Sequence, residues 1–288
     1  MQEIFESFIK DRRYGKGVSV RTEGWYRQSW HAFQDALSGA STESISKSDF
    51  VPVIERFCSR GVNPITVNTY ARAINAFLRW LHEEGRSPKL VRIPRLKEPE
   101  TVVVTFRLEH VQHLMQYRPS SRNQRRAQTL ALLILDTGMR LKEVLSLRVG
   151  DIDLDNLLIT VRDGKGGKQR VVPISVELRK VLFKYISAHS SASGLVFCSR
   201  DGVRLLQNNV RRDFKAVCVR LRILGVKGGF HVLRHTFAVN YIRNGGDVFR
   251  LQRILGHTTL DMTRRYVNLQ TEDLQAVHDK LSLLSRWG

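Results

Sequence analysis

The sequence is poor in acidic residues relative to basic ones. Its 288 residues include 27 Asp and Glu against 47 Lys and Arg, which gives a net charge of +20. Most of this excess, +15, falls in residues 99–288, and only +5 falls in residues 1–98. Solubility does not require so large an excess of one sign. The composition therefore indicates a polyanionic partner, for which nucleic acid is the default.

Cysteine and long apolar segments are also scarce. The three cysteines, Cys58, Cys198 and Cys218, are far apart in apolar stretches, which predicts reduced structural thiols rather than a disulfide framework. No apolar run approaches the roughly 18 residues that a membrane span needs. The first residues, MQEIFESFIKDRR, carry acids where a secretory signal has a basic start. We therefore expect a cytoplasmic protein with no membrane partner.

The pattern of residues 1–95 predicts a helical domain. Its clearest helix begins at Pro64 and ends near Gly85, because apolar residues recur between them at helical spacing. The opposite face of this helix carries four polar residues spaced four, three and four apart: Asn68, Arg72, Asn75 and Arg79. Such a face suits either a DNA groove, where asparagine can reach adenine and arginine guanine, or plain solvent. The sequence leaves both interpretations open.

A segment with three prolines and several charges, residues 86–104, has the composition of a linker. We expect a helical domain in residues 1–95, a linker in 96–104 and a second domain in 105–288. In the second domain, the pattern predicts helices over residues 109–117, 125–136, 140–147, 177–188, 207–224, 231–244, 248–255, 259–266 and from 271 onward. The stretch LLITVRDGKGGKQRVVPIS alternates and breaks at its glycines, which predicts a β-hairpin. The expected fold is mainly α with a small antiparallel β-sheet.

Five side chains of the second domain suit chemistry on a phosphodiester without a metal: Arg140, His231, Arg234, His257 and Tyr266. The planar fork of arginine fits phosphate oxygens. Histidine can move protons near neutral pH. Tyrosine is a poor nucleophile alone and attacks only where such groups assist it.

Two other kinds of site match less well. His231 and His235 have the histidine spacing of a zinc-binding HExxH motif, but Val232 stands where the glutamate is needed. We expect His235 to pack in the core or to bond a backbone carbonyl. GKGGK is similar to part of a phosphate-binding loop, but strands flank it and Gln169 stands where Ser or Thr is required. The sequence therefore predicts no metal site and no nucleotide loop.

The motifs and their order resemble the tyrosine recombinase (phage integrase) family. They are Arg140 in TGMRLKEVLSL, Lys165 in DGKGGKQRVVPIS, His231 and Arg234 in HVLRH, His257 in LGH and Tyr266 in TTLDMTRRYVNL. The resemblance is strong over residues 105–270. It is weaker over VNTYARAINAFLRWLHEEG, which looks like the DNA-clamping domain of the family.

The resemblance implies a site-specific DNA recombinase. Tyr266 would attack a DNA phosphate to give a 3′-phosphotyrosine, and Lys165, with Lys168 as the rival, would protonate the departing 5′-hydroxyl. Glu143, three residues after Arg140, would hold the fork of that arginine. Four protomers would pair two inverted core sites of double-stranded DNA and exchange strands through a Holliday junction, without cofactor, metal or small-molecule substrate. Further candidate DNA contacts on the 207–224 helix are Arg211, Arg212 and Lys215.

The final predicted helix, 271–288, carries an apolar stripe made of Leu274, Val277, Leu281 and Leu284. By the resemblance it would dock on a neighbouring protomer; the alternative is that it folds back on its own domain. A type IB topoisomerase-like enzyme and a non-catalytic DNA-binding regulator on the same fold are the alternative functions. The lack of an extra arm-binding domain favours a Xer-like or small mobile-element recombinase.

Overall fold

The computed structural model describes the chain apart from residues 39–40, 100–102, 163–168, 190–192, 224–228 and 268–288. The chain forms two compact units, Met1–Thr101 and Val102–Gly288. Each unit has its own hydrophobic core, so each is described by itself. Among the described residues, no helix has both the length and the apolar character needed to cross a bilayer.

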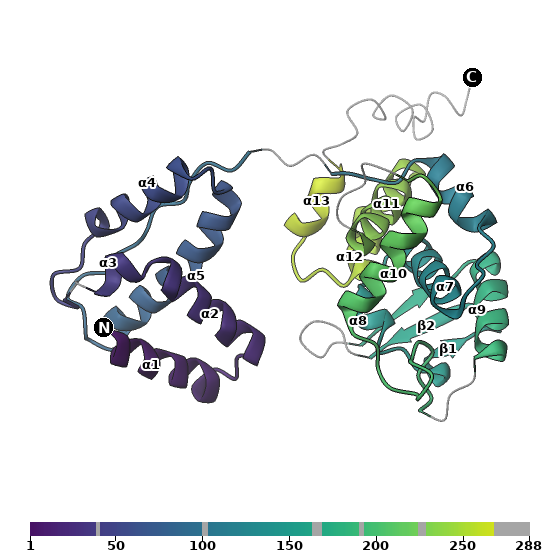
Figure 1. The fold of residues 1–288 in the computed structure, drawn as a ribbon, viewed down its shortest axis with the longest axis horizontal. Helices are drawn as coiled ribbons and strands as arrows, with labels where there is room; N and C mark the ends of the chain where they lie inside the picture. Colours follow the sequence, from purple (N-terminus) through teal and green to yellow (C-terminus); the bar gives the residue numbers. More distant parts are fainter. Residues whose placement is uncertain (39–40, 100–102, 163–168, 190–192, 224–228, 268–288) are drawn as a thin grey trace, which may run out of the picture. The chain divides into compact units, whose positions relative to one another are not determined.

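The first unit is helical (Figure 1). Its elements are α1 (Gln2–Lys10), the π-helical turn η1 (Asp11–Gly15), α2 (Val20–Ala32), α3 (Gln34–Ser38), the 3₁₀ turn η2 (Lys47–Phe50), α4 (Val51–Ser59) and α5 (Pro64–Glu83). Helix α5 begins where the sequence predicts, because Asn63 caps it by accepting a hydrogen bond from the Ile65 N–H. Helices α2 and α5 pack together around an aromatic cluster in which Phe5 stacks on Trp30 at 4.2 Å between ring centroids.

The second unit combines helices with one small sheet (Figure 1). Its helices are α6 (Leu108–Gln116), α7 (Arg122–Thr137), α8 (Leu141–Val144), the 3₁₀ turn η3 (Val149–Asp151), α9 (Val176–Ala188), α10 (Gln207–Arg220), α11 (Phe230–Arg243), α12 (Val248–Leu255) and α13 (Asp261–Val267). Helix α7 is central, since α9, α10 and α11 all pack against it. Three of its side chains, Leu130, Leu133 and Ile134, are completely buried.

The sheet is antiparallel with the order β1-β2-β3. Its strands are β1 (Ile152–Asp153), β2 (Leu158–Val161) and β3 (Arg170–Pro173). Strands β2 and β3 form the predicted hairpin, and their register pairs Ile159 with Val172, both fully buried. The short β1 was not predicted. The expected fold class, mainly α with a small antiparallel sheet, is confirmed.

One helix is much shorter than the sequence predicts. The pattern favours a helix over residues 140–147, but α8 ends at Val144. The chain turns away because the backbone of Leu147 and Val149 bonds to a distant strand-like segment: the Val196 N–H donates to Leu147 O, and the Val149 N–H donates to Gly194 O. Tertiary pairing thus overrides local helix propensity here. The predicted helix from residue 271 lies outside the described residues.

Candidate active site

A tight turn between α7 and α8 places Arg140. Gly138 caps α7 in the left-handed region at φ 64°, which glycine adopts without steric cost. A Cβ at this position would overlap the ring of Phe237 and lie 2.7 Å from Leu255 Cδ2. The backbone of Gly138 therefore lies directly against α11 and the end of α12. Two residues later, Arg140 stands at the start of α8.

Three arginines meet at the C-terminal end of α12. Arg170 Nε donates to Ile254 O at 2.8 Å, Arg234 Nη2 to Leu255 O at 2.8 Å, and Arg140 Nη2 to Gly256 O at 3.0 Å. The last carbonyls of a helix have no partner within the helix and carry its partial negative charge. These carbonyls thus hold three guanidinium groups together despite their mutual repulsion.

Glu143 completes this cluster. Its side chain is only 3% exposed, and it accepts a bidentate pair from Arg170, at 3.0 and 2.7 Å, and a bond from Arg140 Nη1 at 2.9 Å. The Arg140 N–H also donates to Glu143, at 2.9 Å. Burial alone would raise the pKa of this carboxyl, but the hydrogen bonds and charge of Arg170 and Arg140 hold it below its usual value. Glu143 therefore remains ionised and fixes both forks.

Arg234 and His257 form a buried pair beside this cluster. Arg234, 6% exposed, donates from Nη1 to Gly138 O at 2.6 Å and from Nη2 to His257 Nε2 at 3.0 Å. Burial and the nearby charge of Arg140 lower the pKa of Arg234 to about 9. Burial, followed by the charge of Arg234, lowers the pKa of His257 to about 3. His257 is therefore neutral at physiological pH.

The hydrogen-bond network assigns the tautomer of His257. Arginine can only donate, so Nε2 is the acceptor. The proton is then on Nδ1, which lies 2.8 Å from Thr263 Oγ1. The ring of His257 thus accepts from Arg234 and donates to Thr263, because burial among arginines disfavours the second proton.

A small cavity opens between these groups. It has a volume of about 20 Å³ and is lined by Arg140, Arg234, His231, Arg211 and three apolar residues. This is room for about one water molecule, and so for one phosphate oxygen. His231 is exposed at the start of α11. Partial desolvation and then the charge of Arg211 hold the pKa of His231 below its ordinary value.

Tyr266 lies on α13, with 0% of its surface exposed. Its hydroxyl is 2.8 Å from His235 Nδ1 and 2.9 Å from Arg265 Nη2. The ring packs against a cluster that includes Leu251 and Leu255 of α12. The expectation for His235 was wrong: this side chain neither packs in the core without a polar partner nor bonds a backbone carbonyl, but contacts the tyrosine hydroxyl.

Sequence reasoning missed two members of the site, Arg170 and His235. Arg170 begins a short strand and resembles a surface residue in the sequence, so its contact with α8 and α12 left no signal in the periodicity. His235 was expected to pack in the core or to bond a backbone carbonyl, because no sequence pattern connects it with Tyr266, 31 residues away. Among the described residues, no group of three or more His, Cys, Asp and Glu is placed to hold a metal ion. Lys165 and Lys168 lie outside the described residues.

Comparison with known proteins gives this cluster its context. The phage integrase family matches residues 105–273, more than half of the chain. The chain belongs to the phage integrase family. The tyrosine recombinase XerA of Thermococcus kodakarensis is 30% identical over 234 residues, covering 78% of this chain and 78% of the relative. XerC of Xanthomonas campestris pv. campestris is 30% identical over 291 residues, covering 95% of this chain and 86% of the relative.

Solved structures of similar fold include an integrase. The Tn1549 transposon integrase in complex with circular intermediate DNA matches with a TM-score of 0.77 at 20% identity, over 91% of this chain and 94% of that one. The family match and the relatives XerA and XerC show that the protein is a tyrosine site-specific recombinase, as the motif order predicts. These relatives do not favour the alternatives, a topoisomerase-like enzyme or a non-catalytic regulator.

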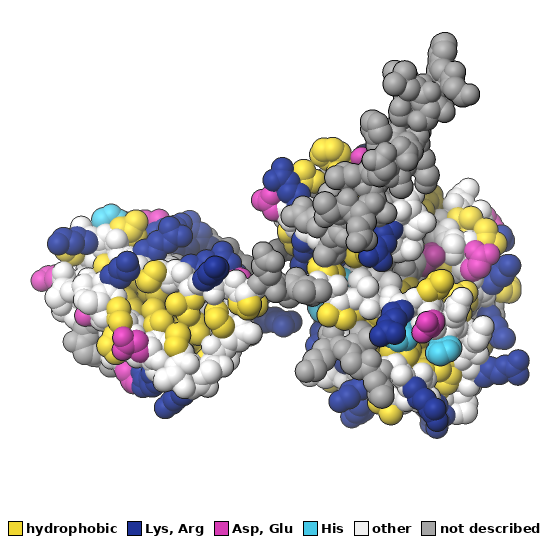
Figure 2. Space-filling model, turned by 90° about the horizontal axis from the view of Figure 1, so that it is seen from above, with side chains coloured by type: hydrophobic (Ala, Val, Ile, Leu, Met, Phe, Trp, Pro, Cys, Tyr) yellow, Lys and Arg dark blue, Asp and Glu magenta, His cyan; other side chains and the backbone are white. Residues whose placement is uncertain are grey.

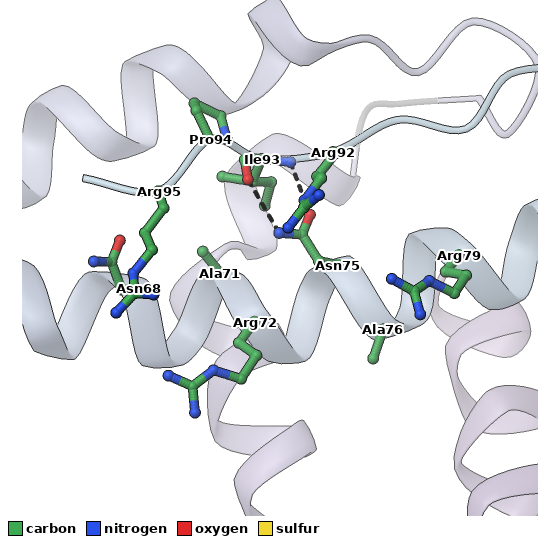
Figure 3. Close-up of a pocket in the computed structure, with 10 residues that line it drawn as sticks. All are labelled: Asn68, Ala71, Arg72, Asn75, Ala76, Arg79, Arg92, Ile93, Pro94 and Arg95. Carbon is green, nitrogen blue, oxygen red and sulfur yellow. Dashed lines mark hydrogen bonds between the residues drawn. The ribbon is translucent and has the colours of Figure 1, made fainter. Parts of the chain in front are cut away.

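The first unit of the recombinase carries a basic groove along α5. Its volume is about 550 Å³, and four arginines line it, Arg72 and Arg79 from α5 and Arg92 and Arg95 from the segment that crosses the helix (Figure 3). All four are exposed. Arg95 pairs with Glu98 at 2.8 Å. The groove thus concentrates positive charge between two walls.

The two asparagines of this face have a different role from the one expected. Asn68 is 5% exposed; its amide donates to Leu96 O at 2.9 Å and accepts from the Leu96 N–H at 2.8 Å. Asn75 makes the same pair of bonds with Ile93, at 3.0 and 2.7 Å (Figure 3). Both amides are occupied by the backbone of the expected linker. They therefore fasten that segment to α5, a role that differs from both the DNA contact and the plain solvent exposure that the sequence left open.

The candidate contacts on α10 are on the surface. Arg211, Arg212 and Lys215 are all exposed, and Arg211 also reaches the small cavity. In the space-filling view, Lys and Arg side chains are spread over the visible face of each unit (Figure 2). Arg72 and Arg79 in the first unit and these three residues in the second remain predicted DNA contacts.

Proposed function

We propose that this recombinase cleaves and rejoins duplex DNA through Tyr266, with Arg140 and Arg234 binding the scissile phosphate. The phenol oxygen attacks phosphorus and passes its proton to water, the bond between phosphorus and the 5′ oxygen breaks, and Lys165 supplies a proton to that oxygen, which leaves as a 5′-hydroxyl. The product is a 3′-phosphotyrosine. One phosphoester bond forms as another breaks, so the bond energy is conserved. A 5′-hydroxyl can therefore reverse the step without an energy source.

The oxygen-sized cavity between Arg140, Arg234, His231 and Arg211 carries this proposal. Two guanidinium groups held rigidly by helix carbonyls and Glu143 are preorganised donors for the charge that develops on phosphorus, which is commonly the largest catalytic contribution. An anion in this cavity would also offset the positive charges that lower the pKa of His257 and His231. Phosphate binding would therefore raise the pKa of both histidines, against the lowering that burial, the larger cause, imposes.

We propose double-stranded DNA with paired inverted core sites as the partner. The basic groove of the first unit and the exposed cations of α10 are two separate sources of phosphate contacts. The Tn1549 transposon integrase, which has the same fold, was solved in complex with circular intermediate DNA. We further infer that four protomers assemble on two sites, and that the protein acts in the cytoplasm on a chromosomal or mobile-element site.

The test of this function uses duplexes selected by binding from a random library, placed as two sites on one plasmid. The recombinase should exchange the flanks of the two sites and should form a covalent complex with a nicked version of the site. A topoisomerase would relax the plasmid without exchange. A binding protein would do neither, and that result would refute the proposal.

Tetramer formation has its own test. Deleting residues 271–288 removes the apolar stripe that would link protomers. Single-site binding should then stay nearly unchanged, while cooperative two-site assembly and recombination are lost, as measured by gel shift on one-site and two-site DNA. Normal recombination by the truncated protein would rule out docking of this segment on a neighbour.

A further inference from the structure

The hydroxyl of Tyr266 has two polar neighbours with different capacities. Arg265 Nη2, at 2.9 Å, can only donate a hydrogen bond. The hydrogen of the phenol itself must therefore point to His235 Nδ1, at 2.8 Å. Both bonds together fix the direction of the oxygen as well as its position. The two rings are 5.7 Å apart between centroids and tilted by 50°, so they pack without stacking.

His235 shares a helix with the groups that surround the cavity. His231, Arg234 and His235 are at positions i, i+3 and i+4 of α11, which lie on one face of a helix. His231 and Arg234 line the oxygen-sized cavity, and His235 holds the tyrosine. One rigid element thus fixes the phenol oxygen relative to the phosphate-binding groups. The Tyr266 hydroxyl is also near enough to Arg234 to raise the pKa of that arginine by its charge.

We propose that His235 is a positioning residue for the nucleophile, holding the Tyr266 hydroxyl in register with the phosphate site through its Nδ1. This inference rests on the proposed role of Tyr266 as the nucleophile. Correct placement of a reacting atom contributes a large part of enzymatic rate, and a displacement of about 1 Å can cost about a hundredfold. His235 is therefore expected to act on the rate of cleavage and not on DNA affinity.

The electrostatics favour a geometric role over proton transfer. Burial, and then the charges of Arg265, His231 and Arg234, lower the pKa of His235 to about 4. A base this weak is poorly matched to a phenol, whose ordinary pKa is about 10. The neutral ring is, however, well suited to accept a hydrogen bond at Nδ1 and to donate from Nε2.

Two substitutions separate positioning from other roles. His235→Asn places an amide oxygen near the position of Nδ1 and keeps an acceptor, but it supplies no base. His235→Leu keeps bulk and removes the acceptor. Cleavage should be about 10- to 100-fold slower in His235→Leu and within about threefold of the unchanged protein in His235→Asn. DNA affinity should be equal in all three.

The measurement is the single-turnover rate of covalent complex formation on a nicked duplex site. His189→Leu is the matched control, because this histidine directly follows α9 and its ring stacks on Tyr185 outside the site. This variant should cleave normally. Thermal melting verifies folding. If His235→Leu melts below the assay temperature, His235→Met replaces it, since methionine fills irregular space.

Each outcome decides the proposal. Wild-type rates in His235→Leu would show that the contact has no function in cleavage. A faster rate would show that His235 restrains the tyrosine instead of positioning it. Equal slowing in the Asn and Leu variants would assign His235 a proton-transfer role. Peptide mapping of the covalent complex is done in parallel: an adduct on a residue other than Tyr266 would refute the proposed function itself, whereas an adduct on Tyr266 with unaltered variant rates would refute only the His235 proposal.

Discussion

Replacing Arg170 with methionine removes the guanidinium that joins β3 to α8 and α12. Methionine fills much of the space of the stem, so the main loss is polar. The Glu143 carboxylate, 3% exposed, loses two of its four hydrogen bonds, and the Ile254 carbonyl loses one. Breaking a buried ion pair from one side costs about 3–5 kcal/mol. Because Arg140 still bonds Glu143, we expect the free energy of unfolding to fall by the lower end of this range, about 3 kcal/mol at pH 7.

The loss should depend on pH in a defined direction. In the native protein the pKa of Glu143 is lowered from 4.5. Its stabilisation is therefore complete above the unfolded pKa and is lost as pH falls through the folded pKa. In Arg170→Met, burial still disfavours the carboxylate while fewer cations oppose it, so its pKa rises. Glu143 is therefore protonated at a higher pH in the variant than in the unchanged protein. The difference between their free energies of unfolding should narrow as pH is lowered.

Urea unfolding followed by circular dichroism at several pH values measures this effect. Arg179→Met is the matched control, because Arg179 is 47% exposed and pairs at 3.8 Å with an almost fully exposed Asp155. Such surface pairs contribute about 0–1 kcal/mol. Equal losses in the two variants, or a gap in Arg170→Met that does not change with pH, would refute the assigned role of the Arg170–Glu143 pair.

Two further expectations concern the ends of the proposed machinery. Gly256→Ala should slow cleavage without weakening DNA binding, because Gly256 has φ +63° and a Cβ would lie 3.1 Å from the Arg170 guanidinium. Gly61→Ala is the control, since Gly61 has φ +67° but open space around it, so that variant carries only the backbone strain. Equal cleavage rates in the two variants would contradict this expectation. Arg72→Gln combined with Arg79→Gln should weaken DNA binding. The slope of log K against log salt concentration should become less steep by about two, roughly 0.9 per lost phosphate contact. An unchanged slope would show that the groove does not bind DNA.

The sequence predicts most of the helices because their apolar spacing is local. Helix α5 illustrates this, since its cap, its first proline and its apolar stripe are all contained in one segment. Helix α8 shows the limit: its expected length failed because residues near 195 compete for the backbone of residues 147–149. A pairing with a segment some fifty residues away leaves no trace in the local pattern.

In the candidate site, too, local motifs could be predicted from the sequence and long-range contacts could not. The order of the motifs predicts that Arg140, Arg234 and Tyr266 belong to one site. The role of Asn68 could not be predicted, because a polar helix face looks the same whether solvent or a backbone segment covers it. Contacts to backbone groups, such as those of Asn68 to Leu96 and of Arg234 to Leu255, depend on no particular partner side chain. The sequence therefore gives candidates for the reactive groups but little information on the contacts that hold them in place.

The most direct test of the account is to locate the covalent bond to DNA. A nicked duplex site traps the cleaved complex, and mass spectrometry of the DNA-linked peptide identifies the attached residue. We expect a peptide linked through Tyr266. We expect no covalent complex from Tyr266→Phe, which should bind the same duplex with unchanged affinity. Tyr241→Phe is the matched control and should cleave normally. A covalent complex formed by Tyr266→Phe, or a linkage at any other residue, would contradict the central claim.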